Sequence, residues 1–125
     1  MIDHIMINVQ DFEKSKAFYK AVLAPLGYIH VWELQGWAGF SAEGKPDSCW
    51  GFWIQGGQQL IPPIHVAFRS DSRAKTRAFY EAALKAGGKD NGPPGIREHY
   101  HPNYYGAFVY DLDGHNIEAV CHNPE

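Results

Sequence analysis

The stretch that decides the fold is HIMINVQDFEKSKAFYKAVLAPLG, residues 4–27, which recurs without a gap as HVAFRSDSRAKTRAFYEAALKAGG, residues 65–88. A shift of 61 residues superimposes His4 on His65 and each Ala-Phe-Tyr triplet on the other. A gapless match over about two dozen residues indicates a duplicated unit of roughly half the chain. The sequence therefore predicts one domain, residues 1–125, built from two modules at about 1–57 and 62–125.

Each copy begins as a strand and continues as a helix. In residues 4–9 and 64–69 the side chains alternate, so both histidines face away from the main apolar row. Capping residues and glycines then bound a helix in each copy. The predicted helix boundaries are Asp11 with Pro25 and Gly27 in the first copy, and Asp71 or Ser72 with Gly87 and Gly88 in the second.

Three further β-type runs follow each helix and complete the order βαβββ. The segment from Asp111 to Gly114 predicts a hairpin between the last two strands. The predicted fold class is α+β, with tandem βαβββ modules forming curved mixed sheets and the helices on the outside. The predicted later strands are residues 28–34, 37–41, 48–55, 96–100, 104–110 and 115–121, with 55–63 as the linker and 87–95 as an irregular loop.

The composition is that of a folded protein without a feature that attracts nucleic acid or membranes. Hydrophobic residues make up 45% and charged residues 20%, close to the globular norm. A formal net charge of -3 and the lack of a basic run argue against nucleic-acid binding. No export signal or membrane-length apolar run is visible. Cys49 and Cys121 form no disulfide framework, so we expect reduced thiols in a cytoplasmic protein.

The C-terminal part carries the motif D-x-D-G-x-x-I-E, from Asp111 to Glu118. With the paired βαβββ order and a histidine at the head of each module, it resembles the vicinal-oxygen-chelate superfamily. That superfamily includes glyoxalase I, extradiol dioxygenases, fosfomycin-resistance thiol transferases and bleomycin-resistance proteins. The resemblance implies metal ligands on the first and last strands of each module, which here are His4, His65 and Glu118.

The fourth ligand position of that pattern departs from glyoxalase I. It falls on Gly51 or, with a two-residue slip, on Trp53, and neither residue binds a metal. Two imidazoles and one carboxylate suit a divalent ion such as Zn, Mn, Fe or Ni, with open positions for a small substrate with vicinal oxygens. Lyase, isomerase, dioxygenase and thiol-transferase chemistry remain open. The alternative is a metal-free protein that binds a small molecule or antibiotic, as in the bleomycin-resistance branch.

The resemblance also implies a homodimer, in which His4 faces His65 and Glu118 of the partner. The linker can reach either way, so the sequence does not decide whether the site forms within one chain or between two.

The segment IREHYHPNYY, residues 96–105, is the densest cluster of polar and aromatic residues. As an extended strand it would place Arg97, His99 and His101 on one face. These three are the candidate catalytic residues, with Arg97 binding a substrate carboxylate or phosphate and a histidine acting as general base. A solvated strand is the competing interpretation. The candidate substrate-binding residues are Tyr100 and Tyr104 from this segment and Trp32, Trp37 and Trp53 from the first module.

The first module holds all four tryptophans, which suit an aromatic cavity for a planar or hydrophobic ligand. The alternative interpretation is that at least half of the tryptophans fill the hydrophobic core. His30, His115 and His122 have no repeat partner and are interpreted as structural or exposed.

Overall fold

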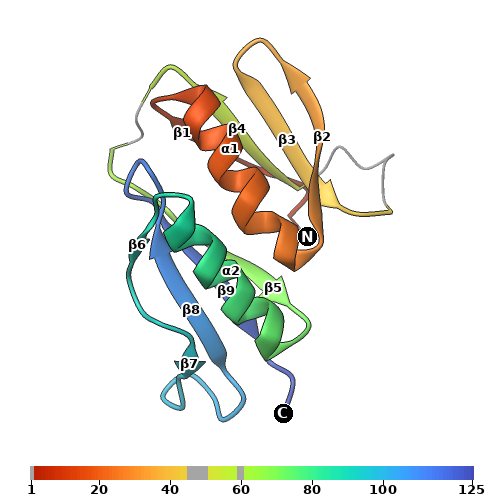
Figure 1. Cartoon of the computed structure of the whole chain (residues 1–125), viewed down its shortest axis with the longest axis vertical. Coiled ribbons are helices and arrows are strands. Elements are labelled where there is room, and N and C mark those ends of the chain that lie inside the picture. The colour runs from red at the N-terminus through yellow and green to blue at the C-terminus, as the bar shows by residue number, and fades with distance from the viewer. Residues whose placement is uncertain (1, 45–50, 59–60) are drawn as a thin grey trace.

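The computed structural model describes residues 2–44, 51–58 and 61–125, whose strands form two sheets (Figure 1). In each sheet the first strand of the module pairs in parallel with the last, and the other pairs are antiparallel. The predicted α+β fold of βαβββ modules is confirmed. The first sheet has the order β1 (Ile5–Val9), β4 (Phe52–Gly56), β3 (Trp37–Ala42), β2 (Tyr28–Leu34), and the second β5 (His65–Ser70), β9 (Asn116–Cys121), β8 (Tyr105–Tyr110), β6 (Lys89–Asp90), with β7 (Gly95–Ile96) also paired to β8.

The two helices begin at corresponding positions of the repeat, α1 at Phe12–Leu23 and α2 at Arg73–Lys85. The Asp11 side chain accepts a hydrogen bond from the Lys14 backbone N–H, and the Ser72 side chain accepts one from Lys75. These bonds satisfy N–H groups that have no partner within the helix. A 3-10 turn at Ala24–Leu26 extends α1 and ends at Gly27, whose φ of 81° suits glycine. In the described residues no helix is both long and apolar enough to cross a membrane.

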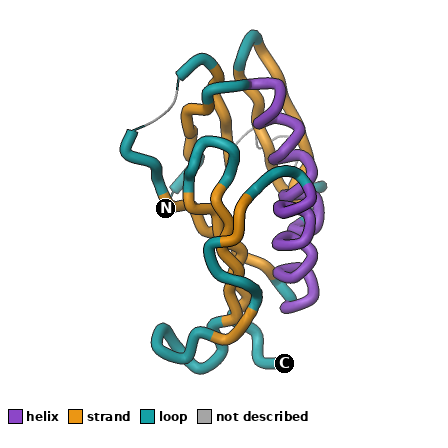
Figure 2. The backbone as a smooth tube through the Cα atoms, turned by 60° about the vertical axis from the view of Figure 1, so that its left-hand side comes forward, coloured by secondary structure: helices purple, strands orange, loops and turns teal. Residues whose placement is uncertain are grey.

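Both helices lie on the same side of the sheets, and the opposite face has no helical cover (Figures 1 and 2). The strand pattern explains this arrangement. Along β5, Val66 and Phe68 are buried, whereas His65 and Ala67 are exposed. The buried row packs with the helices, because α1 also contacts α2 and the buried apolar residues of both modules form one cluster. As predicted, His65 points to the face away from the apolar row.

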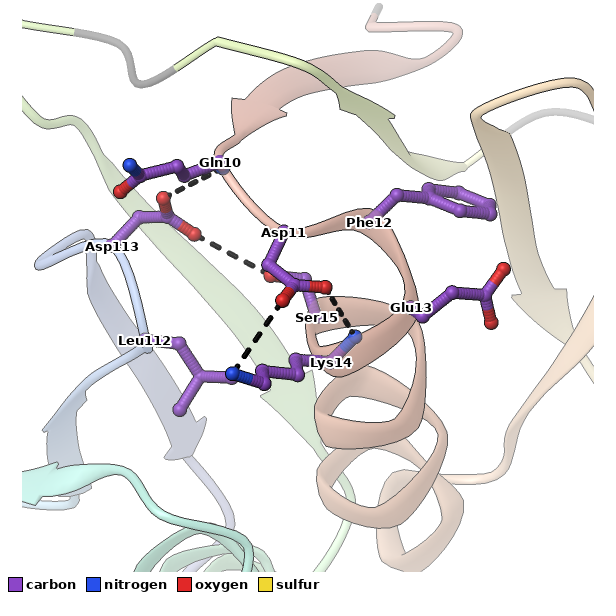
Figure 3. A pocket seen from close by; sticks show the side chains of 8 residues that line it. All are labelled: Gln10, Asp11, Phe12, Glu13, Lys14, Ser15, Leu112 and Asp113. Atoms are coloured by element: carbon purple, nitrogen blue, oxygen red, sulfur yellow. Dashed lines mark hydrogen bonds and ion pairs between the residues drawn. The ribbon is translucent and has the colours of Figure 1, made fainter.

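The turn between β8 and β9 connects the second module to the first by buried hydrogen bonds. The Tyr19 hydroxyl of α1 donates to the Asp111 carboxylate, whose other oxygen accepts from the backbone N–H groups of Asp113 and His115 at 2.9 and 2.8 Å. Asp113 in turn accepts from the Gln10 backbone N–H at 2.8 Å and from the Ser15 hydroxyl at 3.4 Å (Figure 3). The predicted hairpin is therefore confirmed, and its aspartates also join the modules.

His115 is fully buried and bridges the two first strands. Its Nδ1 accepts from the Ile64 backbone N–H at 3.1 Å, so its Nε2–H donates to the Asn8 carbonyl at 3.0 Å. The interpretation of His115 as structural agrees with these contacts. They also place the beginning of β5 beside the end of β1.

The structure corrects the predicted strand at residues 96–100. Strand β7 ends at Ile96, and residues 98–100 form a turn. The Arg97 N–H donates to the Tyr104 carbonyl at 2.7 Å, and the Tyr100 N–H donates to the Arg97 carbonyl at 3.0 Å. The chain therefore folds back on itself after Arg97, and the inferred alternation of Arg97, His99 and His101 on one strand face is wrong. Residues 48–50 of another predicted strand lie outside the described residues, as does Trp50.

Candidate functional site

His65 and Glu118 meet on the face of the second sheet that no helix covers. Glu118 pairs with Ala67 on the neighbouring strand β5, two residues after His65, which places both side chains on that face. The His65 Nε2 atom lies 3.0 Å from Glu118 Oε2. The Glu118 side chain is 2% exposed and the His65 side chain 49% exposed. A buried carboxylate thus shares one edge with an imidazole that reaches the surface.

Tyr104 holds the other oxygen of this carboxylate. Its hydroxyl donates a hydrogen bond to Glu118 Oε1, which leaves Oε2 toward His65. Burial and this hydrogen bond to a carboxylate raise the pKa of Tyr104, so the hydroxyl stays protonated and remains a donor at neutral pH. The Tyr104 ring is itself packed against the rings of Tyr100, His101 and His122, at centroid distances of 4.8, 5.9 and 5.2 Å.

The His65 and Glu118 pair fits two ligands of a divalent metal ion. Imidazole nitrogen and carboxylate oxygen are ligands for Zn, Mn, Fe and Ni. Two ligand atoms that each lie about 2.1 Å from an ion, at right angles, are separated by about 3 Å, which matches the 3.0 Å between Nε2 and Oε2. Within the residues that the structure describes, no third His, Cys, Asp or Glu joins them to form a complete ligand group.

Within the described residues of one chain, His4 does not complete a metal-ligating group with His65 and Glu118. The bridge through His115 places the beginning of β5 beside Asn8, at the end of β1. His4 precedes β1 and is four residues from Asn8, which corresponds to about 13 Å of extended chain. Its Nδ1 lies 2.6 Å from Asp3, and it shares the rim of a hollow of about 490 Å³ with His65, Tyr28 and Phe68. His4 and His65 therefore line one hollow between the two modules.

The parallel pairing decides the position equivalent to Glu118 in the first module. Glu118 pairs with Ala67, and the repeat partner of Ala67 is Met6, which pairs with Trp53. The two-residue slip considered from the sequence is therefore the correct register, and Trp53 takes the place of a carboxylate. Its ring lies over Gly39, where a Cβ atom would be 2.9 Å from the indole.

The tryptophans form an aromatic patch on the first sheet. The ring centroids of Trp32 and Trp53 are 5.3 Å apart. Trp37 and Trp53 line a small hollow of about 130 Å³ together with His4 and Met6. Trp53 is nearly buried, whereas Trp32 and Trp37 are 38% and 40% exposed. The patch is thus partly surface and partly packed interior.

Two of the three candidate catalytic residues do not reach the pair. His99 is exposed and contacts the Tyr100 ring at 4.2 Å. His101 Nε2 lies 2.7 Å from His122 Nδ1, and its own Nδ1 accepts from the Asn103 N–H, so Nε2 is the donor. These contacts give His101 a role in holding the aromatic ring cluster around Tyr104. The contact of His122 was missed from the sequence because its partner His101 lies 21 residues away in the chain.

The Phe108 ring lies between Arg97 and His65 in a chain of side-chain contacts. The Arg97 Cζ atom is 5.6 Å from the Phe108 ring centroid, and that centroid is 6.2 Å from the His65 ring. Phe108 is directly opposite Glu118 across the β8–β9 ladder, so the two side chains share the uncovered face.

A larger hollow, of about 640 Å³, lies at the beginning of α1 (Figure 3). Its carboxylates already have partners, because Asp11 caps the helix and pairs with Lys14 while Asp113 binds Gln10 and Ser15. Asp113 therefore serves the connection between the modules and Asp11 the beginning of α1, and the uncovered sheet face is the candidate site.

The chain thus combines two βαβββ modules in one fold, with a histidine and a glutamate on a sheet face that no helix covers. The chain belongs to the glyoxalase/bleomycin resistance protein/dioxygenase superfamily, whose family model matches residues 1–119. No curated protein sequence matches the chain.

Solved structures agree with this family over nearly the whole chain. A glyoxalase/bleomycin resistance protein from Albidiferax ferrireducens T118 is 28% identical with a TM-score of 0.80, covering 97% of this chain and 98% of its own. The fosfomycin resistance protein FosX from Mesorhizobium loti is 23% identical with a TM-score of 0.68, covering 97% and 91%. A family enzyme from Burkholderia phytofirmans PsJN is 14% identical with a TM-score of 0.72, covering 97% and 98%. The last two similarities concern the fold.

Proposed function

We propose that the protein is a metal-dependent enzyme of the glyoxalase/dioxygenase-like type. In this proposal His65 and Glu118 of one chain and the partner's His4 hold a divalent ion in a homodimer. The substrate is a small molecule with vicinal oxygens. The observation that carries the proposal is the 3.0 Å contact between His65 Nε2 and the buried Glu118 Oε2 on the uncovered face.

In this proposal each residue of the site has a separate role. Glu118 supplies a charge that is costly to bury without a cation nearby. Tyr104 fixes the rotation of that carboxylate by binding Oε1. When bound, a divalent ion supplies Lewis-acid polarisation of substrate oxygens. The His65 side chain lies at the rim, where a substrate can approach from solvent.

The second chain enters the proposal because, within the described residues of one chain, His4 does not join His65 and Glu118 in a metal-ligating group, although it lines the same hollow as His65. A dimer that places the uncovered face of the first module against that of the second would bring the partner's His4 toward His65 and Glu118. It would also cover the exposed Trp32 and Trp37. Burial of such apolar area stabilises an association of two chains.

Mixed dimers test both the metal site and its assembly. A His4→Ala chain and a His65→Ala chain each lose one ligand, so each variant alone is expected to bind metal weakly. When the two are unfolded and refolded together, a site shared between chains yields mixed dimers with one intact site and one that lacks two ligands. We expect equilibrium dialysis to recover about one tight metal site per mixed dimer.

Two results would contradict the proposal. If wild-type protein binds no divalent ion, or binds it as well after His65→Ala, the metal site is wrong. If mixed dimers bind no better than the single variants, the sharing of His4 between chains is wrong. His99→Ala is the matched control, because His99 is exposed and its ring contacts Tyr100, and the metal affinity of this variant should equal that of the wild type.

A second candidate is metal-free binding of a small molecule or antibiotic. The contact of Trp32 with Trp53 and the hollow beside Trp37 favour it. Aromatic rings provide stacking surfaces for planar ligands without a metal. Under this candidate, His65→Ala would leave ligand affinity unchanged while Trp32→Ala would reduce it.

A further inference from the structure

Two histidines that take no part in the proposed metal site are bonded to each other beside it. His101 lies in the loop between β7 and β8, and His122 follows directly after β9. His101 Nε2 and His122 Nδ1 are 2.7 Å apart, and both side chains are half-buried. This bond therefore joins the loop to the end of the last strand.

The backbone decides which nitrogen of His101 carries the proton. The Asn103 N–H donates to His101 Nδ1 at 3.0 Å, so a neutral His101 has its proton on Nε2. That Nε2–H donates to His122 Nδ1, which accepts only while it carries no proton. Both bonds exist together only when both rings are neutral.

A proton on either ring breaks one of these bonds. If His122 is protonated at Nδ1, the new N–H points at the Nε2–H of His101. If His101 is protonated at Nδ1, the new N–H points at the N–H of Asn103. Moving the His101 proton from Nε2 to Nδ1 restores the first contact and loses the second. Histidine changes its charge between about pH 5 and 8, so mild acid breaks the connection.

Among the described residues, no acidic side chain pairs with either histidine to compensate a positive charge there. The titratable group that faces both rings is Tyr104, at centroid distances of 5.9 Å from His101 and 5.2 Å from His122. The next titratable or charged groups along these contacts are His99, Tyr100, Arg97 and Glu118 around Tyr104, and Asp71 with Lys75 beyond Asn123.

The loop that this pair holds also positions Tyr104. The Tyr104 N–H donates to the His101 carbonyl at 3.0 Å, and the Tyr104 ring packs against both imidazoles. The Tyr104 hydroxyl in turn holds the Glu118 carboxylate. A change in the histidine pair therefore reaches the candidate site through one side chain.

We infer that His101 and His122 form an acid-sensitive latch, which holds the loop closed while both rings are neutral and releases Tyr104 from Glu118 when either ring is protonated. The latch depends only on contacts within the chain and does not rest on the proposed metal ion. It adds a response to pH to the candidate site, and either statement can fail without the other.

Hydrogen exchange of the loop amides tests the latch. The full chain is measured with a chelator present, so that metal binding does not change with pH. Millisecond exchange of the Asn103 and Tyr104 N–H groups is divided by the rates of an unstructured peptide with the same sequence. We expect this protection to fall about 3- to 10-fold between about pH 7.5 and about pH 5.5, because closure loses one or two neutral hydrogen bonds.

Substitutions of His122 assign the fall to the pair. His122→Asn keeps an acceptor near the Nδ1 position but takes up no proton, so its protection should be equal at both pH values. His122→Ala removes the acceptor and should show the low protection at both. His99→Ala is the matched control, because His99 is exposed on the same loop, and it should retain the pH dependence of the wild type.

The release of Tyr104 has a separate readout. Burial and the bond to Glu118 raise the pKa of Tyr104. In His122→Ala this pKa should fall toward that of free tyrosine, as measured by NMR of labelled tyrosine ring carbons. An unchanged pKa would overturn the coupling between the latch and Glu118.

Three other results would overturn the latch itself. The first is equal wild-type protection at both pH values, and the second is a fall that persists in His122→Asn. The third needs no variant. NMR of the ring nitrogens at the higher pH should show His101 protonated on Nε2 and His122 bare at Nδ1, so a proton found on His101 Nδ1 contradicts the inference.

Discussion

The hydrogen bond from Tyr19 to Asp111 should contribute a large share of the stability of the paired modules. Tyr19 is fully buried in α1, and its hydroxyl donates to a carboxylate on the β8–β9 turn of the other module. Tyr19→Phe keeps the ring and its contact with Phe52, whose centroid lies 4.8 Å away. The substitution therefore removes one donor and leaves Asp111 Oδ2 buried without it.

The expected loss follows from the charge of the acceptor. A hydrogen bond to a charged group contributes about 1.5–3 kcal/mol. The entropy of unfolding is about 2.1 cal/mol/K per residue, so over 125 residues this loss lowers the melting temperature by roughly 6–11 °C.

The loss should also depend on pH. Burial raises the pKa of Asp111 above its ordinary value, and the Tyr19 hydroxyl opposes that rise. A carboxyl whose pKa is higher in the folded state loses stability as pH rises from its ordinary pKa through the folded value. Without the hydroxyl the folded pKa rises further. The cost of Tyr19→Phe should therefore be smaller near pH 4 than at pH 7.

The assay is urea unfolding at fixed protein concentration between pH 4 and pH 8. Tyr80→Phe is the matched control, because Tyr80 is the repeat partner of Tyr19 and its hydroxyl bonds the exposed Asp90 at 2.9 Å. We expect that control to change the free energy of unfolding by about 0.5 kcal/mol or less. A loss equal to that of the control, or one that stays constant across the pH range, would contradict a charged hydrogen bond between Tyr19 and Asp111.

Three further predictions concern the site and its surroundings. Tyr104→Phe should lower divalent-metal affinity about 10- to 100-fold in calorimetric titrations, because Glu118 loses its orienting bond, whereas Tyr105→Phe should not. Gly39→Ala should destabilise the protein by about 1–3 kcal/mol through collision with Trp53, and a double variant with Trp53→Leu should recover part of the loss in thermal unfolding. A metal ion at 100 times its dissociation constant should stabilise the wild type by about 2.7 kcal/mol, a gain absent from Glu118→Gln.

Local features of the sequence were sufficient for much of the fold. The repeat, the helix caps and the alternation around His65 depend on residues close together in the chain, and the structure agrees with each. The predicted strand at 96–100 is wrong because the chain turns there, and this turn is held by a hydrogen bond from the Arg97 N–H to the Tyr104 carbonyl, seven residues later. Alternating polarity alone does not distinguish such a turn from an exposed strand.

Sequence patterns alone predicted the two-module architecture, the faces of the first strands and a short list of candidate metal ligands. Tertiary structure decided which of them meet. Parallel pairing brought Glu118 beside His65 and placed Trp53 at the matching position. Among the described residues, His4 does not join them in a three-ligand group. Tertiary structure also brought Tyr104 onto Glu118. The physical reason is that strand pairing and module packing join residues far apart in the chain, whereas sequence patterns report only on neighbours along it.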